Sequence, residues 1–302
     1  MTIPFMLRAL AELVLLALIC GPVGAFVLVR RLSFATDALT HTVFPGVVIG
    51  FLAGGIDGVF LGALVAAVVT AVALTLLTRT GGVGDDDATA VLLTAMFAIG
   101  VVLVSRRSSF ASDLTAFLFG RILTVTPRQL VETAVLGVVV LALLALGGRQ
   151  FLFRAFDPVA ASAAGFRLGR LDLWLNLIVA LVVVAAVRAV GTVLVVALLV
   201  VPAAAARLVT ARFLAIMLLG TALTAAAGWL GLWLSWTASV DHGLRLTSAS
   251  AVVLLLVAAY LLLLPVRRLP QLADAARKAR LNSPAAANAR PPLPLNPGKQ
   301  SR

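Results

Sequence analysis

The sequence predicts an all-α polytopic membrane protein with about nine transmembrane helices (eight to ten) and no soluble domain. Hydrophobic residues make up 62% of the 302 residues and charged residues only 12%, and the mean hydropathy is +1.12. Runs such as LDLWLNLIVALVVVAAV approach the ~20 apolar residues that a helix needs to cross a bilayer. These runs lack the polar/apolar alternation of outer-membrane strands, so helices are expected rather than a barrel.

The chain contains nine apolar segments that are candidate spans, and the arginines between them determine the predicted topology. Basic residues favour the cytoplasmic side of a membrane, which places the N-terminus outside and the C-terminus inside. Arg106 and Arg107 then face outward, and residues 113–125 could dip into the membrane and change the number of spans. The candidate spans are residues 10–29, 40–55, 58–78, 89–104, 130–147, 172–187, 190–206, 213–236 and 247–264.

Composition divides the chain into a transmembrane domain, residues 1–265, and a basic tail, residues 266–302. The tail is rich in Pro, Ala and Arg and is expected to be disordered, because it cannot bury a core. It carries most of the formal net charge of +12, as a cytoplasmic end does, so the charge does not indicate nucleic-acid binding. The single cysteine, Cys20, cannot form an intrachain disulfide.

The stretch RRLSFATDALTHTVFPG places Asp37 and His41 at the start of an apolar span. Their i, i+4 spacing puts both side chains on one helical face, and Thr36 and Thr40 add hydroxyl oxygens nearby. A carboxylate with a neutral imidazole suits a divalent ion such as zinc, manganese or iron. Alternatively, Asp37 caps the helix at the membrane boundary and His41 packs inside the bundle.

Other polar groups have simpler interpretations. Asp241 and His242, in an outward-facing loop, form either a solvated turn or a place where a cation is admitted. The aspartates of GGVGDDDAT (residues 81–89) are typical of a helix start. Glu12 and Glu132 are isolated acids, and each is expected to be a satisfied polar group or a helix-end residue rather than part of a proton relay. No G-x-x-x-x-G-K-[ST] phosphate loop and no H-E-x-x-H zinc motif occurs, so the chain is not expected to be an enzyme.

Two segments on the predicted cytoplasmic side could dock a soluble partner or simply be interfacial turns. FDPVAASAAGFRLGRLDL spans residues 156–173, and LVVPAAAARLVTARF spans residues 199–213. Both are rich in alanine, and the second carries a proline followed by arginines.

Together these stretches resemble the permease subunits of ATP-binding-cassette importers for divalent metals (zinc, manganese or iron), and more distantly those for cobalamin and iron chelates. The match is collinear over most of residues 8–264. RALAELVLLALICGPVGAFVLVRRLSFATDALTHTVFPGVVIG and AVGTVLVVALLVVPAAAARLVT carry it most specifically. The sequence departs from the family in LRLTSASAVV, which lacks the usual P-S-G-like turn before the last span.

The resemblance implies a bacterial cytoplasmic-membrane permease that works as a homodimer with cytoplasmic ATP-binding subunits and an extracellular or periplasmic metal-binding protein. The metal is a transported substrate, and no permanently bound cofactor is expected. Asp37 and His41 are implied as the ion site. The implied coupling element is residues 202–213, with residues 156–167 as a second choice. The coupling residues are Pro202, Ala206, Arg207, Thr210 and Arg212 in the first segment and Asp157, Ala160 and Gly165 in the second.

Three rival functions stay open at this point. A permease for a metal chelate or haem would use a wider, more apolar pathway. An autonomous proton-coupled carrier would work without an ATPase and would be expected to carry more intramembrane acids. A membrane scaffold without transport would need Asp37 and His41 only for stability.

Overall fold

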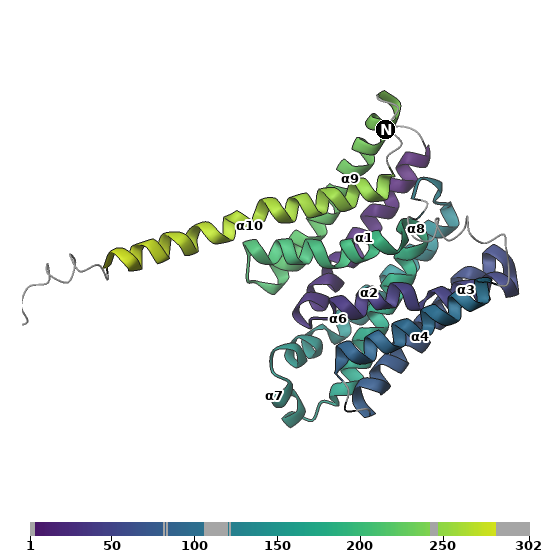
Figure 1. Cartoon of the computed structure of the whole chain (residues 1–302), viewed down its shortest axis with the longest axis horizontal. Coiled ribbons are helices and arrows are strands. Elements are labelled where there is room, and N and C mark those ends of the chain that lie inside the picture. Colours follow the sequence, from purple (N-terminus) through teal and green to yellow (C-terminus); the bar gives the residue numbers. More distant parts are fainter. Residues whose placement is uncertain are drawn as a thin grey trace, which may run out of the picture.

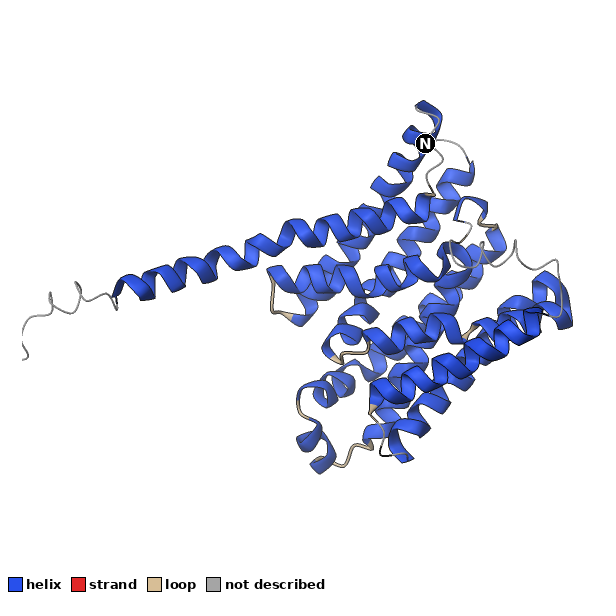
Figure 2. Cartoon of the chain, viewed as in Figure 1, coloured by secondary structure: helices blue, strands red, loops and turns tan. Residues whose placement is uncertain are grey.

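The chain folds into a bundle of helices, and no strand occurs among the residues that the computed structural model describes (Figures 1 and 2). These are residues 4–80, 82, 84–105, 120, 122–241 and 247–281. The helices are α1 (Pro4–Val29), α2 (Ser33–Thr42), α3 (Phe44–Thr80), α4 (Asp85–Ser105), the short 3-10 helix η1 (Ile122–Thr124), α6 (Pro127–Phe156), α7 (Pro158–Ala163), α8 (Leu168–Val209), α9 (Phe213–Asp241) and α10 (Ser248–Leu281).

Local sequence signals fix where several helices begin and bend. At the start of α6, the hydroxyl of Thr126 accepts a hydrogen bond from the backbone of Gln129, and the Gln129 side chain accepts one from the backbone of Thr126. This capping box satisfies amides that lack partners within the helix. Gly55 (φ 62°) and Gly191 (φ 78°) interrupt α3 and α8, because glycine adopts positive φ without a steric cost.

Ion pairs mark the two ends of the bundle. At one end, Asp172 near the start of α8 binds Arg30 after α1 at 2.6 Å and Arg154 near the end of α6 at 3.3 Å. At the other end, near the start of α6, Arg128 binds Asp57 at 2.5 Å and Glu132 binds Arg188 of α8 at 2.6 Å. We call the first the basic end, because most arginines of the turns between helices gather there: Arg30, Arg31, Arg79, Arg154, Arg167, Arg170, Arg207 and Arg212.

The long helix α8 crosses the bundle twice. Its first arm, residues 168–190, runs from the basic end to the contact between Arg188 and Glu132. After the bend at Gly191, the second arm, residues 192–209, runs back toward the basic end. Its direction is shown by the contact between Leu199 and Gly24, which lies in the second half of α1. At about 1.5 Å per residue the arms are about 34 Å and 27 Å long, close to the ~30 Å thickness of the hydrocarbon core.

Counting these arms separately turns eight candidate membrane helices into nine passes in the described part of the chain. The predicted fold class is therefore confirmed, including the separate spans at residues 172–187 and 190–206. The start of α1 and the point where α10 leaves the bundle lie at opposite ends, as an odd number of passes requires. Phe5 contacts Trp236 near the end of α9, whereas α10 leaves the bundle at the basic end (Figure 1). The predicted dip at residues 113–125 lies mostly outside the described residues.

The core is built around α8, with α1 as its main partner. Val182, Val183, Leu194, Leu198 and Leu199 of α8 are buried. A β-carbon on Gly24 of α1 would lie 2.1 Å from the carbonyl oxygen of Leu199. The two backbones therefore approach as closely as small residues allow in membrane helix pairs.

The expected disorder of residues 266–302 needs a correction for the first part of the tail. α10 continues as helix to Leu281 and projects from the basic end (Figure 1). The sequence ADAARKARL is rich in strong helix formers, which explains the continuation beyond the apolar span. Residues 282–302 lie outside the described residues.

Candidate functional site

The short helix α2 positions Asp37 and His41. The backbone turns after α1 through Arg31 at a positive φ of 57°, and α2 then packs between α8 and α4. Nε2 of His41 lies 4.0 Å from Oδ1 of Asp37. The i, i+4 spacing therefore brings the two side chains together, as the sequence predicts.

The pair has the geometry of two ligands around a small ion. At 4.0 Å the two atoms are too far apart for a hydrogen bond. Metal bonds of about 2.0 to 2.2 Å to each atom would place adjacent ligand atoms about 3 to 4 Å apart. The side chains are 46% exposed for Asp37 and 31% exposed for His41, so an ion could reach both.

The surroundings of the pair are apolar. The ring of Phe97 from α4 stands edge-on to the imidazole of His41, with 6.2 Å between ring centroids. Phe97 is the thirteenth of the 21 residues of α4, which places His41 near the middle of that span. A charged group at this depth is costly unless it faces protein, water or an ion.

The threonines of α2 do not complete the site. The hydroxyl of Thr36 donates to the carbonyl of Leu32 at 2.9 Å, and that of Thr40 donates to the carbonyl of Asp37 at 2.7 Å. Both threonines are fully buried. The described residues contain no group of three or more His, Cys, Asp or Glu arranged to hold a metal. Asp37 and His41 would thus supply only part of the coordination sphere of any metal bound there.

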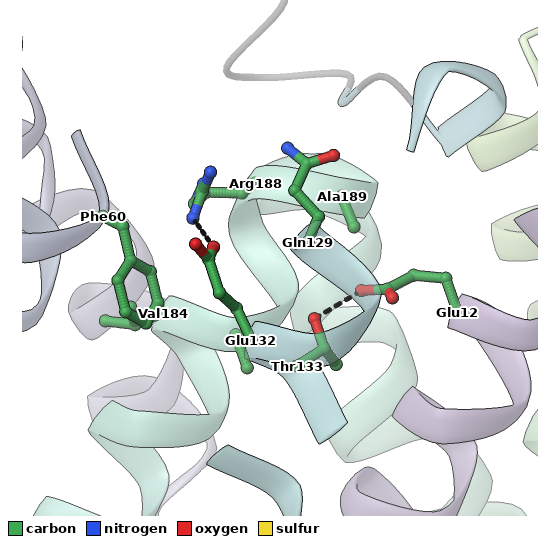
Figure 3. A pocket seen from close by; sticks show the side chains of 9 residues that line it. Glu12, Phe60, Gln129, Glu132, Thr133, Val184, Arg188 and Ala189 are labelled. Carbon is green, nitrogen blue, oxygen red and sulfur yellow. Dashed lines mark hydrogen bonds and ion pairs between the residues drawn. The ribbon is translucent and has the colours of Figure 1, made fainter. Parts of the chain in front are cut away.

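A second polar cluster lies toward the end of the bundle opposite the basic end (Figure 3). It contains Glu12 and Glu132, the two acids that the sequence predicts to be isolated. Glu132 accepts from Arg188 at 2.6 Å, and Arg128 donates to Glu132 at 3.1 Å. Glu12 accepts from Thr133 at 2.8 Å, while its Oε2 has no protein partner. Glu132 is thus paired both within its own helix and with α8, whereas Glu12 is satisfied at one oxygen by a residue of α6.

A cavity between these groups has about 10 Å³, which is room for about one water molecule. The guanidinium of Arg188 also lies 5.2 Å from the ring centroid of Phe60. Sequence reasoning did not single out Arg188. An arginine within the apolar run of α8 was the available signal, because a charge at that position requires a partner.

The two predicted coupling segments differ in accessibility. In the second arm of α8, Pro202 and Ala206 are buried, so they cannot touch a soluble partner in this conformation. Arg207 and Arg212 are exposed, and Thr210 is partly exposed. The assignment of the two coupling segments stays a prediction, and in the first segment only the residues from Arg207 onward offer exposed side chains.

The second segment forms the separate helix α7, which stands at the periphery of the basic end (Figure 1). Asp157 caps α7 by accepting from the backbone of Ala160 at 2.8 Å. Asp157 and Gly165 are exposed, and Ala160 is partly exposed. Of the outer candidates, Asp241 ends α9 and is exposed, whereas His242 lies outside the described residues.

Comparison with known proteins places the whole bundle in one family. The sequence pattern of the family described as "ABC 3 transport family" matches residues 2–266. This chain belongs to the ABC 3 transport family. The manganese transport system membrane protein MntC of Halalkalibacterium halodurans is 38% identical over 208 residues, covering 69% of this chain and 70% of that protein.

Two further relatives align with a larger part of this ABC 3 family member than MntC does. The manganese import system permease protein ScaB of Streptococcus parasanguinis is 33% identical over 83% of this chain and 89% of its own length. The structure of PsaBC from Streptococcus pneumoniae in complex with Fab superposes with a TM-score of 0.77. It has 29% sequence identity and covers 90% of this chain and 96% of the PsaBC chain.

Proposed function

We propose that this chain is the membrane-spanning permease of an ATP-driven importer that carries a divalent metal ion, with manganese as the first candidate. The observation that carries the proposal is the Asp37 and His41 pair, held 4.0 Å apart and accessible near mid-span in α2. A carboxylate and an imidazole suit manganese, iron and zinc. Manganese comes first because MntC is named as a membrane protein of a manganese transport system and ScaB as a manganese import permease.

The incomplete ligand set suits transport. A site that encloses the ion with four or more protein ligands would hold it tightly, whereas conduction requires binding weak enough for release. Two ligands from one copy and two from a second copy could hold a dehydrated ion in passing. We therefore include a second permease copy in the functional unit, with the pathway between the copies.

Membership of an ABC transport family and the lack of a phosphate-binding loop motif favour ATP hydrolysis by separate subunits. The basic end is the expected cytoplasmic face, so the N-terminus is outside and the C-terminus inside. The ATP-binding subunits would contact α7, with Arg207 and Arg212 beside it as secondary contacts. The metal-binding protein would deliver its ion at the opposite face, where α9 ends at Asp241.

Transport then follows from alternating access. Metal arrives from outside, is held by Asp37 and His41, and leaves when closure of the ATP-binding subunits changes which side of the pathway is open. The metal is the only ligand that the residues of α2 need to recognise. The role proposed for those residues is coordination of the ion.

Uptake of radioactive manganese, zinc and iron into proteoliposomes tests this proposal. The vesicles would hold the permease with its ATP-binding subunits, and the metal-binding protein would be added outside. We expect ATP-dependent manganese uptake to fall by at least about tenfold in Asp37→Asn and in His41→Ala, since each removes a ligand. Asp86→Asn, at an exposed aspartate in the first turn of α4, serves as the matched control.

Assembly with the ATP-binding subunits is measured in the same preparations. Unchanged uptake in assembled Asp37→Asn and His41→Ala would refute the metal pathway and leave the pair a structural role. Uptake of a metal chelate but of no free metal would favour the chelate permease. Uptake driven by a proton gradient without the ATP-binding subunits would favour the autonomous carrier.

A further inference from the structure

Glu12 of α1 is a fully buried acid that the proposed transport cycle does not use. It is the ninth of the 26 residues of α1, which places it about 12 Å into the helix from the end opposite the basic end. We call that end the outer end, following the proposed topology. The side chain of Glu12 has no exposed surface. Acids inside a span are costly, and they commonly belong to a functional site.

Only one of the two carboxyl oxygens of Glu12 has a partner among the described residues. Oε1 accepts from the hydroxyl of Thr133 on α6 at 2.8 Å, whereas Oε2 has no protein partner. Figure 3 shows the carboxyl group reaching from α1 toward α6. The polar lining of the cavity beside it also includes Gln129, Glu132 and Arg188. A buried water needs two to four polar partners, and this lining supplies them.

The charges around Glu12 do not balance. Arg188 is the cation whose charge acts on Glu12, but it is bound to Glu132 at 2.6 Å. Arg128 is shared between Glu132 and Asp57. The described part of this cluster thus holds three acids and two arginines. An ionised Glu12 would leave one uncompensated negative charge in the interior of the bundle.

The other described elements that pack against α1 near Glu12 bring no further cation. Arg8, one turn earlier in α1, donates instead to the carbonyl of Pro4 at 3.3 Å. The only ionisable residue of α9 is Asp241 at its end, and η1 has none. A buried acid without a counter-ion is stable only in its neutral form, which requires a proton.

The polar side chains form a line from the outer surface to Glu12. Asp57 and Arg128 are 76% and 69% exposed, and Glu132 and Arg188 are each 20% exposed. One water in the cavity would join Oε2 of Glu12 to this line, because the cavity borders all three of the inner residues. A proton could then reach Glu12 from the outer solution without crossing the apolar core.

We propose that Glu12 is a proton-binding site that is filled from the outer side of the membrane. Binding converts the carboxylate to a carboxylic acid, with the proton on Oε2. The acid donates to the water in the cavity, and that water donates to the carboxylate of Glu132. The hydroxyl of Thr133 holds the other oxygen. This site uses neither Asp37 nor His41, so it is independent of the proposed metal pathway.

Infrared spectroscopy of the permease with its ATP-binding subunits in lipid nanodiscs tests the proposal. The carbonyl stretching band of a carboxylic acid is separate from the bands of a carboxylate. We expect Glu12→Gln to remove one carboxylic acid band. The matched variant Glu132→Gln should keep that band, because two arginines hold Glu132 in its ionised form. A band that persists in Glu12→Gln, or that both variants lose, would overturn the proposal.

Thermal unfolding of the same preparations is a second test. Glutamine resembles the neutral acid, because it can accept from Thr133 and donate into the cavity. The unfolding midpoint should therefore change by less than about 2 °C in Glu12→Gln. It should fall by at least about 4 °C in Glu132→Gln, since Arg188 loses its ion-pair partner. A Glu12→Gln chain that unfolds as early as Glu132→Gln, or that does not fold, would show that Glu12 needs its charge and would overturn the proposal.

Discussion

Replacing Glu132 by leucine should destabilise the chain more than replacing its partner Arg188 by methionine. The two side chains are each 20% exposed and lie 2.6 Å apart. Glu132 has a second cation, Arg128, at 3.1 Å. Among the described residues, Glu132 is the only acid that forms an ion pair with Arg188, and Glu12 attracts Arg188 from a longer distance. Removal of the acid therefore leaves a partly buried guanidinium without its ion-pair partner, whereas removal of Arg188 leaves Glu132 paired with Arg128.

The magnitudes follow from this asymmetry. Breaking a buried ion pair by removing one partner costs about 3 to 5 kcal/mol, and the partial exposure of this pair argues for about 3 kcal/mol for Glu132→Leu. Arg188→Met loses one charge-assisted hydrogen bond and should cost about 1 to 2 kcal/mol. In Glu132→Leu/Arg188→Met the stranded charge is gone, so the double variant should be more stable than Glu132→Leu alone.

The assay is thermal unfolding in lipid nanodiscs, followed by intrinsic tryptophan fluorescence. At about 2 °C per kcal/mol for a chain of this size, the midpoint should fall by about 6 °C in Glu132→Leu and by about 3 °C in Arg188→Met. A larger fall in Arg188→Met than in Glu132→Leu would refute the reasoning. A double variant less stable than both single variants would refute it as well.

The passes were predictable because each is a local property of the sequence. Apolar runs of membrane length indicate spans, and Gly191 between two such runs allows the bend that separates the arms of α8. The proximity of Asp37 and His41 also follows from spacing within one helix. The hydrogen bonds from the Thr36 and Thr40 hydroxyls to backbone carbonyls could also have been predicted from local geometry. Helical threonines often donate to a carbonyl of the preceding turn.

The second polar cluster was not predictable from local patterns. Glu132 and Arg188 are 56 positions apart, and Glu12 and Thr133 are 121 apart. The cost of a charge within a span requires that a partner exists, but only the packing of α1, α6 and α8 decides which partner it is. The same limit applies to the coupling segments, because the burial of Pro202 depends on how α8 bends back against α1.

Two further predictions follow from close contacts in the structure. Gly24→Val should cost about 3 kcal/mol or more by overpacking, since its β-carbon would lie 2.1 Å from the carbonyl oxygen of Leu199. In the control Gly148→Ala, the nearest atom to the new β-carbon is 3.8 Å away. Equal unfolding midpoints for the two variants would contradict this explanation. Asp157→Ala should remove the α7 cap at a cost of about 1 kcal/mol, whereas Asp157→Asn keeps an acceptor for the backbone of Ala160. If α7 transmits closure, metal-stimulated ATP hydrolysis should fall in Asp157→Ala and persist in Asp157→Asn. An equal fall in both variants would instead assign the aspartate charge, rather than the helix start, to the contact with the ATP-binding subunits.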